Sequence, residues 1–151
     1  MIKVTFCGHR DAWGIDNLTP VVIAAIEKAA QGDKVQFLMG GNGAFDGFAL
    51  RCGKAYKTAH PDATLLFVTP YLDPEYLARR NIEWSDFDGV VVPPIEGTPP
   101  KYAIRRRNEY MVDQADLVIA YVDRIRGGAY TTLCYAYKRS KAYCNLGSFV
   151  F

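Results

Sequence analysis

A glycine-rich segment follows an apolar stretch in the first third of the chain. Residues 35–39 run directly into Gly40, Gly41, Asn42 and Gly43, and a helical pattern begins immediately afterwards. Glycines adopt positive φ and let a main chain approach a ligand closely. The free N–H groups and the positive dipole end of a following helix attract an anion. These four residues are therefore predicted to bind a phosphate or a sugar, with a plain tight turn as the alternative.

Asp46 lies in the first turn of the helix that follows these glycines. An acidic residue at this position complements the helix dipole, so capping is one interpretation. A carboxylate at a loop mouth also accepts hydrogen bonds from ribose hydroxyls, or stabilises the positive charge that develops as an N-glycosidic bond breaks. Asp46 is thus the candidate catalytic residue if the chain is an enzyme.

The elements that position these residues are given by recurring apolar runs with helical patterns between them. The runs cover residues 2–6, 35–39, 64–69, 88–92, 116–122 and 146–151. Most are continuous rather than alternating, which is typical of strands covered on both faces of a parallel sheet. The sequence therefore predicts an α/β fold: a three-layer Rossmann-like sandwich with a mostly parallel sheet of five to six strands. Residues 1–151 are expected to form a single domain.

The segments between the apolar runs carry residue patterns that are typical of helices. Thr19 is predicted to cap a helix that has Pro20 at its first position and that ends near Gly32. Further helices are expected from Phe45 onwards, over residues 74–81, over residues 102–114, and from Gly127 towards the carboxyl end. The proline-rich residues 93–100 read either as a lid or as a plain surface connection.

In an open parallel sheet, ligands bind outside the carboxyl ends of the strands. The residues that follow the predicted strands are the remaining candidates: Gly8, His9, Arg10, Thr69, Tyr71, Gly127 and Gly128. Arg10 suits bidentate phosphate binding, whereas His9 is either functional or structural. Gly127 and Gly128 offer a second helix N-terminus to an anion, or form a flexible turn. Tyr71 either stacks on a base or packs internally.

An arginine run precedes the fifth apolar stretch. Residues 105–107 are all arginine and span about 200° of a helix, so they cannot all serve one site. Asn108 shares an apolar stripe with Ile104 and Met111. A buried amide without a partner costs about 1 to 3 kcal/mol, so Asn108 should bond a ligand or a loop backbone. Arg107 adjoins that face and is the arginine expected in the site.

Composition narrows the function classes. The 151 residues contain 18 Lys plus Arg against 16 Asp plus Glu, so the net charge of +2 gives no global attraction to nucleic acid or a membrane. The four cysteines lack metal-site spacing and only two histidines are present, so we expect reduced thiols, no metal and no cofactor. No signal peptide or long apolar run is recognisable, and a cytoplasmic location is expected.

Three segments together resemble the SLOG superfamily: residues 6–10, residues 40–46, and residues 107–123 followed by Gly127 and Gly128. The similarity covers nearly the whole chain and is closest to the YpsA-like branch. The resemblance implies a Rossmann-like fold, a nucleotide-related ligand and a homo-oligomer. Relatives include the LOG phosphoribohydrolases, which cleave nucleoside monophosphates at the N-glycosidic bond, and the DprA/Smf proteins, which bind single-stranded DNA. Other SLOG domains sense nucleotide-derived signals.

This chain departs from the LOG enzymes in one motif. Those enzymes carry Pro-Gly-Gly-x-Gly-Thr-x-x-Glu, whereas here Met39 replaces the proline and Asp46 is the only nearby acid. A binding module or sensor for a nucleotide is therefore the favoured hypothesis. One alternative is a nucleoside 5′-monophosphate N-glycosidase in which Asp46 stabilises the cation and Arg10 or Arg107 holds the phosphate.

The other alternative is a single-stranded nucleic-acid binder that uses the arginine run, but the small net charge argues against nucleic acid as a partner. Tyrosines assigned to the last helix suggest a surface for a homo-oligomer: Tyr135, Tyr137 and Tyr143.

Overall fold

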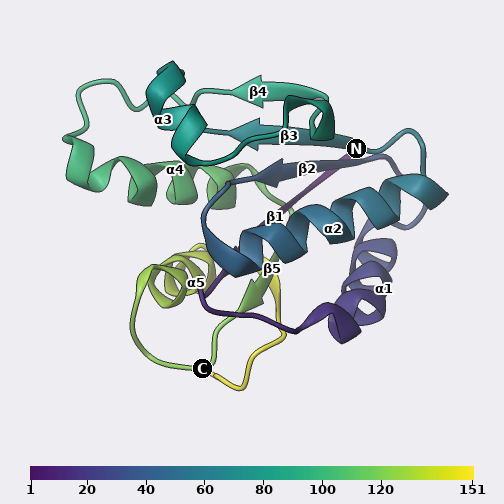
Figure 1. Cartoon of the computed structure of the whole chain (residues 1–151). Coiled ribbons are helices and arrows are strands. Elements are labelled where there is room, and N and C mark those ends of the chain that lie inside the picture. Colours follow the sequence, from purple (N-terminus) through teal and green to yellow (C-terminus); the bar gives the residue numbers. More distant parts are fainter.

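The structure is a computed structural model that describes all 151 residues. Its core is one six-stranded sheet in which every neighbouring pair of strands is parallel (Figure 1). The spatial order is β4-β3-β2-β1-β5-β6. The strands are β1 (Ile2–Gly8), β2 (Val35–Met39), β3 (Thr64–Val68), β4 (Gly89–Val91), β5 (Leu117–Tyr121) and β6 (Ala142–Asn145). The predicted Rossmann-like α/β fold with a parallel sheet is confirmed.

Five helices connect the strands: α1 (Thr19–Ala30), α2 (Gly43–Ala59), α3 (Pro74–Arg79), α4 (Pro100–Gln114) and α5 (Gly128–Lys138). Short 3-10 turns lie at Asp16–Leu18 and Trp84–Asp86. Buried residues of α1 and α2 join one core cluster, and buried residues of α4 and α5 join others, so the helices cover two faces of the sheet. None of the helices has the length and apolar content that crossing a membrane requires.

The larger core cluster shows why these sequences form buried parallel strands. Val4 and Phe6 of β1 alternate with residues of the opposite face and pack against Phe37 of β2 and Phe45 of α2. The rings of Phe6 and Phe37 stack with centroids 6.0 Å apart. The Phe45 ring, 6.4 Å from that of Phe6, therefore packs the start of α2 against the end of β1.

The strand order places a crevice between β1 and β5. From β1 the chain adds β2, β3 and β4 towards one edge, and β5 then pairs on the other side of β1. The connections that leave β1 and β5 consequently diverge onto opposite faces of the sheet. A crevice opens where this happens, at the carboxyl ends of the strands, and it is the place where α/β proteins bind ligands.

The last strand differs from the prediction. The expected strand at residues 146–151 is wrong, because β6 occupies Ala142–Asn145 and Tyr143 lies in it rather than in the last helix. The helix stops at Lys138, and Ser140 then turns the chain with a φ of 56°. The apolar character of the chain end has another cause, since the ring of Phe151 stacks on Tyr137 with centroids 4.0 Å apart.

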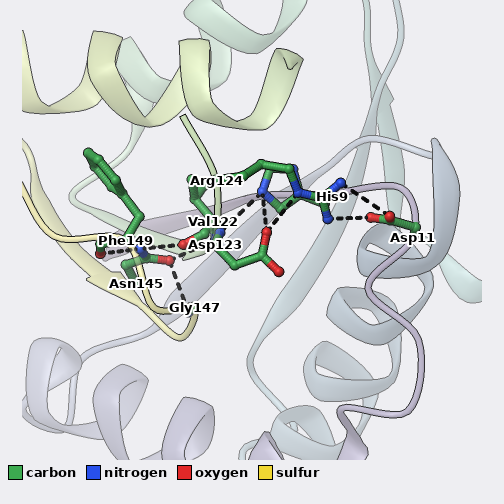
Figure 2. Close-up of polar contacts among 8 residues, drawn as sticks. All are labelled: His9, Asp11, Val122, Asp123, Arg124, Asn145, Gly147 and Phe149. Carbon is green, nitrogen blue, oxygen red and sulfur yellow. Dashed lines mark hydrogen bonds and ion pairs between the residues drawn. The ribbon is translucent and has the colours of Figure 1, made fainter. Parts of the chain in front are cut away.

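The segment after β6 is fastened to the end of β5 by Asn145. Its Oδ1 accepts hydrogen bonds from the N–H groups of Val122 at 2.8 Å and Gly147 at 3.1 Å. Its Nδ2 donates to the carbonyl oxygens of Val122 at 3.0 Å and Phe149 at 2.9 Å (Figure 2). One amide therefore satisfies all its hydrogen-bonding capacity and fixes the residues that lead into the crevice.

Candidate functional site

A cavity of about 640 Å³ lies at the crevice, where β1 ends and α5 begins. Nine predicted site residues line it: Gly8, His9, Arg10, Asn42, Asp46, Arg107, Asn108, Gly127 and Gly128. Five predicted residues are not in its lining: Gly40, Gly41, Gly43, Thr69 and Tyr71. The cavity thus brings together residues from four elements that are far apart in the sequence.

Positive charge dominates this cavity. Five arginines and two aspartates line it: Arg10, Arg80, Arg107, Arg124 and Arg126 with Asp11 and Asp46. Arg124 forms ion pairs at 2.8 Å with both Asp11 and Asp123. None of the other four arginines has a carboxylate oxygen within 4.0 Å. A bound anion would supply the missing counter-charge.

Arg107 is the most deeply buried of these cations, with 3% of its surface exposed. Its Nη1 donates to the carbonyl oxygen of Val68 at 3.1 Å, and its Nε donates to Asn108 Oδ1 at 3.0 Å. Burial lowers the pKa of Arg107, and the nearby charge of Asp46 opposes that shift. A Cβ on Gly40 would lie only 2.8 Å from Nη1, so Gly40 leaves room for the guanidinium.

Asn108 has a different partner from the one that the sequence suggested. Its Oδ1 accepts from the neighbouring Arg107 rather than from a loop backbone, while its Nδ2 makes no hydrogen bond within the chain. Asn108 therefore orients the guanidinium and keeps a donor for a molecule in the cavity.

The chain itself closes the N-terminus of α2. The carboxylate of Asp46 accepts a hydrogen bond from the N–H of Asn42 at 2.7 Å, and the carbonyl oxygen of Arg10 accepts one from the N–H of Ala44 at 2.9 Å. Gly43 has a φ of +85° and packs against the Arg10 backbone. The glycine turn therefore joins the two crevice loops, and a carboxylate already lies where a phosphate was expected.

The N-terminus of α5 is open by contrast. Gly127 caps this helix with a φ of 92°, and no atom lies within 4 Å of a Cβ placed on Gly127 or Gly128. The N–H groups of Gly128, Ala129 and Tyr130 make no hydrogen bond within the chain. Gly127, Gly128 and Ala129 line the cavity. At this helix N-terminus the chain occupies none of the first three N–H groups, whereas at α2 the N–H groups of Asn42 and Ala44 are already bonded.

His9 joins the loops that follow β1 and β5. The ring is 6% exposed, and its Nε2 accepts a hydrogen bond from the N–H of Asp123 at 3.2 Å (Figure 2). The same nitrogen lies 3.2 Å from Asp123 Oδ1, which favours a protonated ring. Burial, followed by the charge of Arg124, outweighs this and lowers the pKa of His9. The lowered pKa and the hydrogen bond from the Asp123 N–H both favour a neutral ring with its proton on Nδ1.

Thr69 and Tyr71 stabilise a turn beside the cavity. Thr69 is fully buried, and its hydroxyl donates to the carbonyl oxygen of Tyr71 at 2.8 Å. The Tyr71 ring packs edge-on against Tyr76 of α3 at 5.1 Å. Arg80, which follows α3 and does line the cavity, was not anticipated. No motif marks this residue in the sequence, and only the course of the chain after β3 brings it to the site.

Asp46→Asn is expected to raise the melting temperature at pH 7 and to have no such effect at pH 3.5. Burial raises the pKa of Asp46 above its ordinary 3.8, although Arg107, the Asn42 N–H and Arg10 oppose the shift. At pH values between 3.8, the ordinary pKa, and the higher pKa of Asp46 in the folded protein, the folded chain binds more protons than the unfolded chain. The stability of the folded protein therefore falls as the pH rises through that window. Asparagine does not ionise, so it removes this loss, and its side-chain oxygen can still accept the hydrogen bond from the N–H of Asn42.

The measurement is thermal unfolding of both proteins at the two pH values. Asp16→Asn is the matched control, because Arg51 holds the pKa of the exposed Asp16 below its ordinary value. That variant should lose a little stability at pH 7. A lower melting temperature of Asp46→Asn at pH 7 would instead favour the helix-capping role of this carboxylate.

Comparison with known proteins identifies the fold. A scan against models of protein families finds no match, and no curated protein matches in sequence. DNA processing protein A (DprA) from Streptococcus pneumoniae is similar in structure, with a TM-score of 0.66 and 14% identity over 100% of this chain and 52% of that one. The chain therefore spans about half the length of that DprA structure.

Two further solved structures are similar. DprA from Helicobacter pylori, described for its single-stranded DNA binding mode, has a TM-score of 0.61 and 18% identity over 99% of this chain and 66% of that chain. The structural-genomics target TM1055 has a TM-score of 0.54 and 15% identity over 95% of this chain and 72% of that chain. These likenesses support the SLOG resemblance at the level of the fold but not the YpsA-like branch. The chain has a DprA-like Rossmann fold.

Proposed function

We propose that this chain binds a phosphate-bearing nucleotide in the arginine-lined cavity, as a binding module or sensor. The observation that carries the proposal is the buried guanidinium of Arg107, 3% exposed and without a carboxylate within hydrogen-bonding reach. A buried cation costs several kcal/mol unless a counter-charge accompanies it, at least part of the time. The free N–H groups at the start of α5 open into the same cavity and favour an anion in the same way.

The polar acceptors of the cavity favour a nucleotide over a simple anion. Asn42 Oδ1 is buried and has no hydrogen-bond partner. The carboxylate of Asp46 lies in the same lining. Acceptors beside a cationic site suit a ligand that carries hydroxyl or amino donors as well as phosphate. A volume of about 640 Å³ also falls within the range of small-molecule sites.

Binding without hydrolysis is the preferred form of this proposal. Glycoside hydrolysis generally uses a pair of carboxyl groups across the scissile bond. Asp46 is the only unpaired carboxylate of the lining, because the other acid, Asp11, is bound by Arg124. An N-glycosidase in which Asp46 stabilises the cation and Arg107 or Arg10 holds the phosphate remains the enzymatic alternative, and it would need water activated without a second carboxylate.

Single-stranded nucleic acid is the second candidate ligand. The small net charge of the whole chain argues against nucleic acid, but arginines are concentrated at the cavity. The H. pylori DprA, which has the same fold, is described as binding single-stranded DNA. Arg105 and Arg106 precede Arg107 on α4 and have side chains that are 63% and 60% exposed, with Glu109 as the carboxylate within 4.0 Å of each. Binding through these residues would weaken steeply as salt rises.

Calorimetric titration with AMP, GMP, ADP, cyclic AMP and ADP-ribose tests the proposal, with adenosine and inorganic phosphate as controls. At least one nucleotide should bind at least tenfold more tightly than adenosine. Chromatography of the incubated mixtures for free base tests the enzymatic alternative, and a dT20 titration at two salt concentrations tests the nucleic-acid one. Failure of every nucleotide to bind would overturn the proposed function.

A further inference from the structure

Arg80 gives the cavity a second cationic region. This residue ends α3, and its guanidinium lies 4.7 Å from the ring centroid of Tyr76. Its Nη2 makes only a long 3.4 Å contact with the Tyr76 hydroxyl. Its Nε is buried and has no hydrogen-bond partner at all. A buried donor of this kind costs about 1 to 3 kcal/mol when it stays unpaired, so an acceptor from outside the chain is called for.

Arg80 and Arg107 are close enough to repel each other. Burial lowers the pKa of Arg107, the charge of Asp46 opposes this, and the charge of Arg80 adds a smaller lowering effect. No carboxylate lies within 4.0 Å of either guanidinium. Arg80 and Arg107 line the same cavity, and neither guanidinium is paired with a carboxylate. Two planar guanidinium groups in such an arrangement can bind a phosphate between them.

This arginine pair is separate from the N-terminus of α5. Arg107 is anchored to the carbonyl oxygen of Val68 at the end of β3, whereas α5 follows β5. In the sheet, β2 and β1 lie between β3 and β5. The Arg107 guanidinium lies against Gly40, which follows β2, because a Cβ on Gly40 would be 2.8 Å from Nη1. Strand β2 is two spacings of about 4.8 Å from β5, so the two cationic regions lie roughly 10 Å apart along the edge of the sheet. Asn42 and Asp46, which follow β2, lie between them.

We propose that the cavity takes a nucleotide with phosphate groups at two separate positions, one between Arg80 and Arg107 and the other on the free N–H groups of α5. This inference rests on the proposed function and names its ligand class. The sugar between the two phosphates lies against the acceptors of Asn42 and Asp46. Directly joined phosphates, as in a nucleoside diphosphate, are too close together to reach both regions. A nucleoside 3′,5′-bisphosphate and a 5′-phosphorylated dinucleotide share the required chemistry.

Calorimetry with four probes tests this: AMP, ADP, adenosine 3′,5′-bisphosphate and the dinucleotide pApA. We expect the bisphosphate or pApA to bind at least about tenfold more tightly than AMP, and ADP to bind within about threefold of AMP. Whichever of the two binds more tightly identifies the source of the second phosphate. Arg80→Met should weaken AMP, the bisphosphate and pApA by a similar factor of at least about five, because the phosphate that they share lies between Arg80 and Arg107, and the gain over AMP should remain.

Arg79→Met is the matched control, because the neighbouring Arg79 is exposed and bonds only Glu75 of its own helix. It should change none of the four affinities. The inference is overturned if the bisphosphate and pApA gain nothing over AMP, or if Arg80→Met leaves the affinities for AMP and the bisphosphate unchanged. In both cases AMP still binds and the proposed function stands, whereas failure of all four probes would overturn the two together. Circular dichroism of each variant checks that the overall secondary structure is retained.

Discussion

Arg107→Met should weaken nucleotide binding about a hundredfold while changing the free energy of unfolding by no more than about 1 kcal/mol. A guanidinium that is 3% exposed offers a phosphate charge-assisted hydrogen bonds in a site largely free of water. Each such bond contributes about 1.5 to 3 kcal/mol, so the loss of one or two accounts for the expected change in affinity.

Two opposing effects on stability nearly cancel in this variant. The carbonyl oxygen of Val68 loses the hydrogen bond from Nη1, which costs about 1 to 3 kcal/mol. Removal of a buried positive charge that lacks an ion-pair partner returns a similar amount. Methionine has about the same length, so it fills the space beside Gly40 without leaving a large cavity.

Denaturant unfolding and calorimetry with the tightest nucleotide of the panel provide the two measurements. Arg106→Met on the same helix is the control, since its guanidinium is 60% exposed and neighbours only Glu109. Arg106→Met should change neither the free energy of unfolding nor the nucleotide affinity appreciably. A loss of several kcal/mol in Arg107→Met with unchanged affinity would show that this arginine supports the fold and not the ligand.

Much of the fold could be predicted because parallel strands are covered on both faces. The continuous apolar runs of β1, β2, β3 and β5 are visible for that reason, and the helices between them follow from their apolar stripes and prolines. The sixth strand could not be located in this way. At the sheet edge Ala142 and Tyr143 are exposed, so β6 has no buried run to mark it, and the apolar pattern instead predicts a strand at the chain end.

The sequence predicts where the site lies, at the ends of the strands, better than it predicts which groups are free to bind a ligand. Crevice topology predicts that Arg10, Asp46 and Gly127 lie around one cavity, because all parallel strands end at the same edge, and these residues do line a single cavity. Arg107 lies in that lining too, but the prediction for this residue rests on its position beside the apolar stripe of its helix. The pattern of glycines did not reveal that Asp46 and the Arg10 carbonyl oxygen use the donors at the start of α2. That occupation depends on how closely the loop after β1 approaches α2, which no local sequence signal encodes.

The role of the glycine turn therefore lies in backbone geometry, and Gly43→Ala should be strongly destabilising. The φ of +85° costs an alanine about 1 to 2 kcal/mol. Its Cβ would also lie 2.7 Å from the Cα of Arg10, so a main chain and not a flexible side chain must move. Overpacking and loss of the hydrogen bond from the Ala44 N–H raise the expected loss to about 3 to 5 kcal/mol.

Gly14→Ala separates the two causes of this loss. Gly14 has a similar φ of +70°, but no atom lies within 4 Å of a Cβ placed there, so only the backbone strain of about 1 to 2 kcal/mol applies. Urea unfolding of both variants measures the difference that the close approach to Arg10 adds. Gly43→Ala should also weaken nucleotide binding, because displacement of the loop moves His9 and Arg10 in the cavity lining, whereas Gly14→Ala should not. Equal losses in the two variants would mean that the loop yields freely, and the junction between β1 and α2 would then not determine the shape of the cavity.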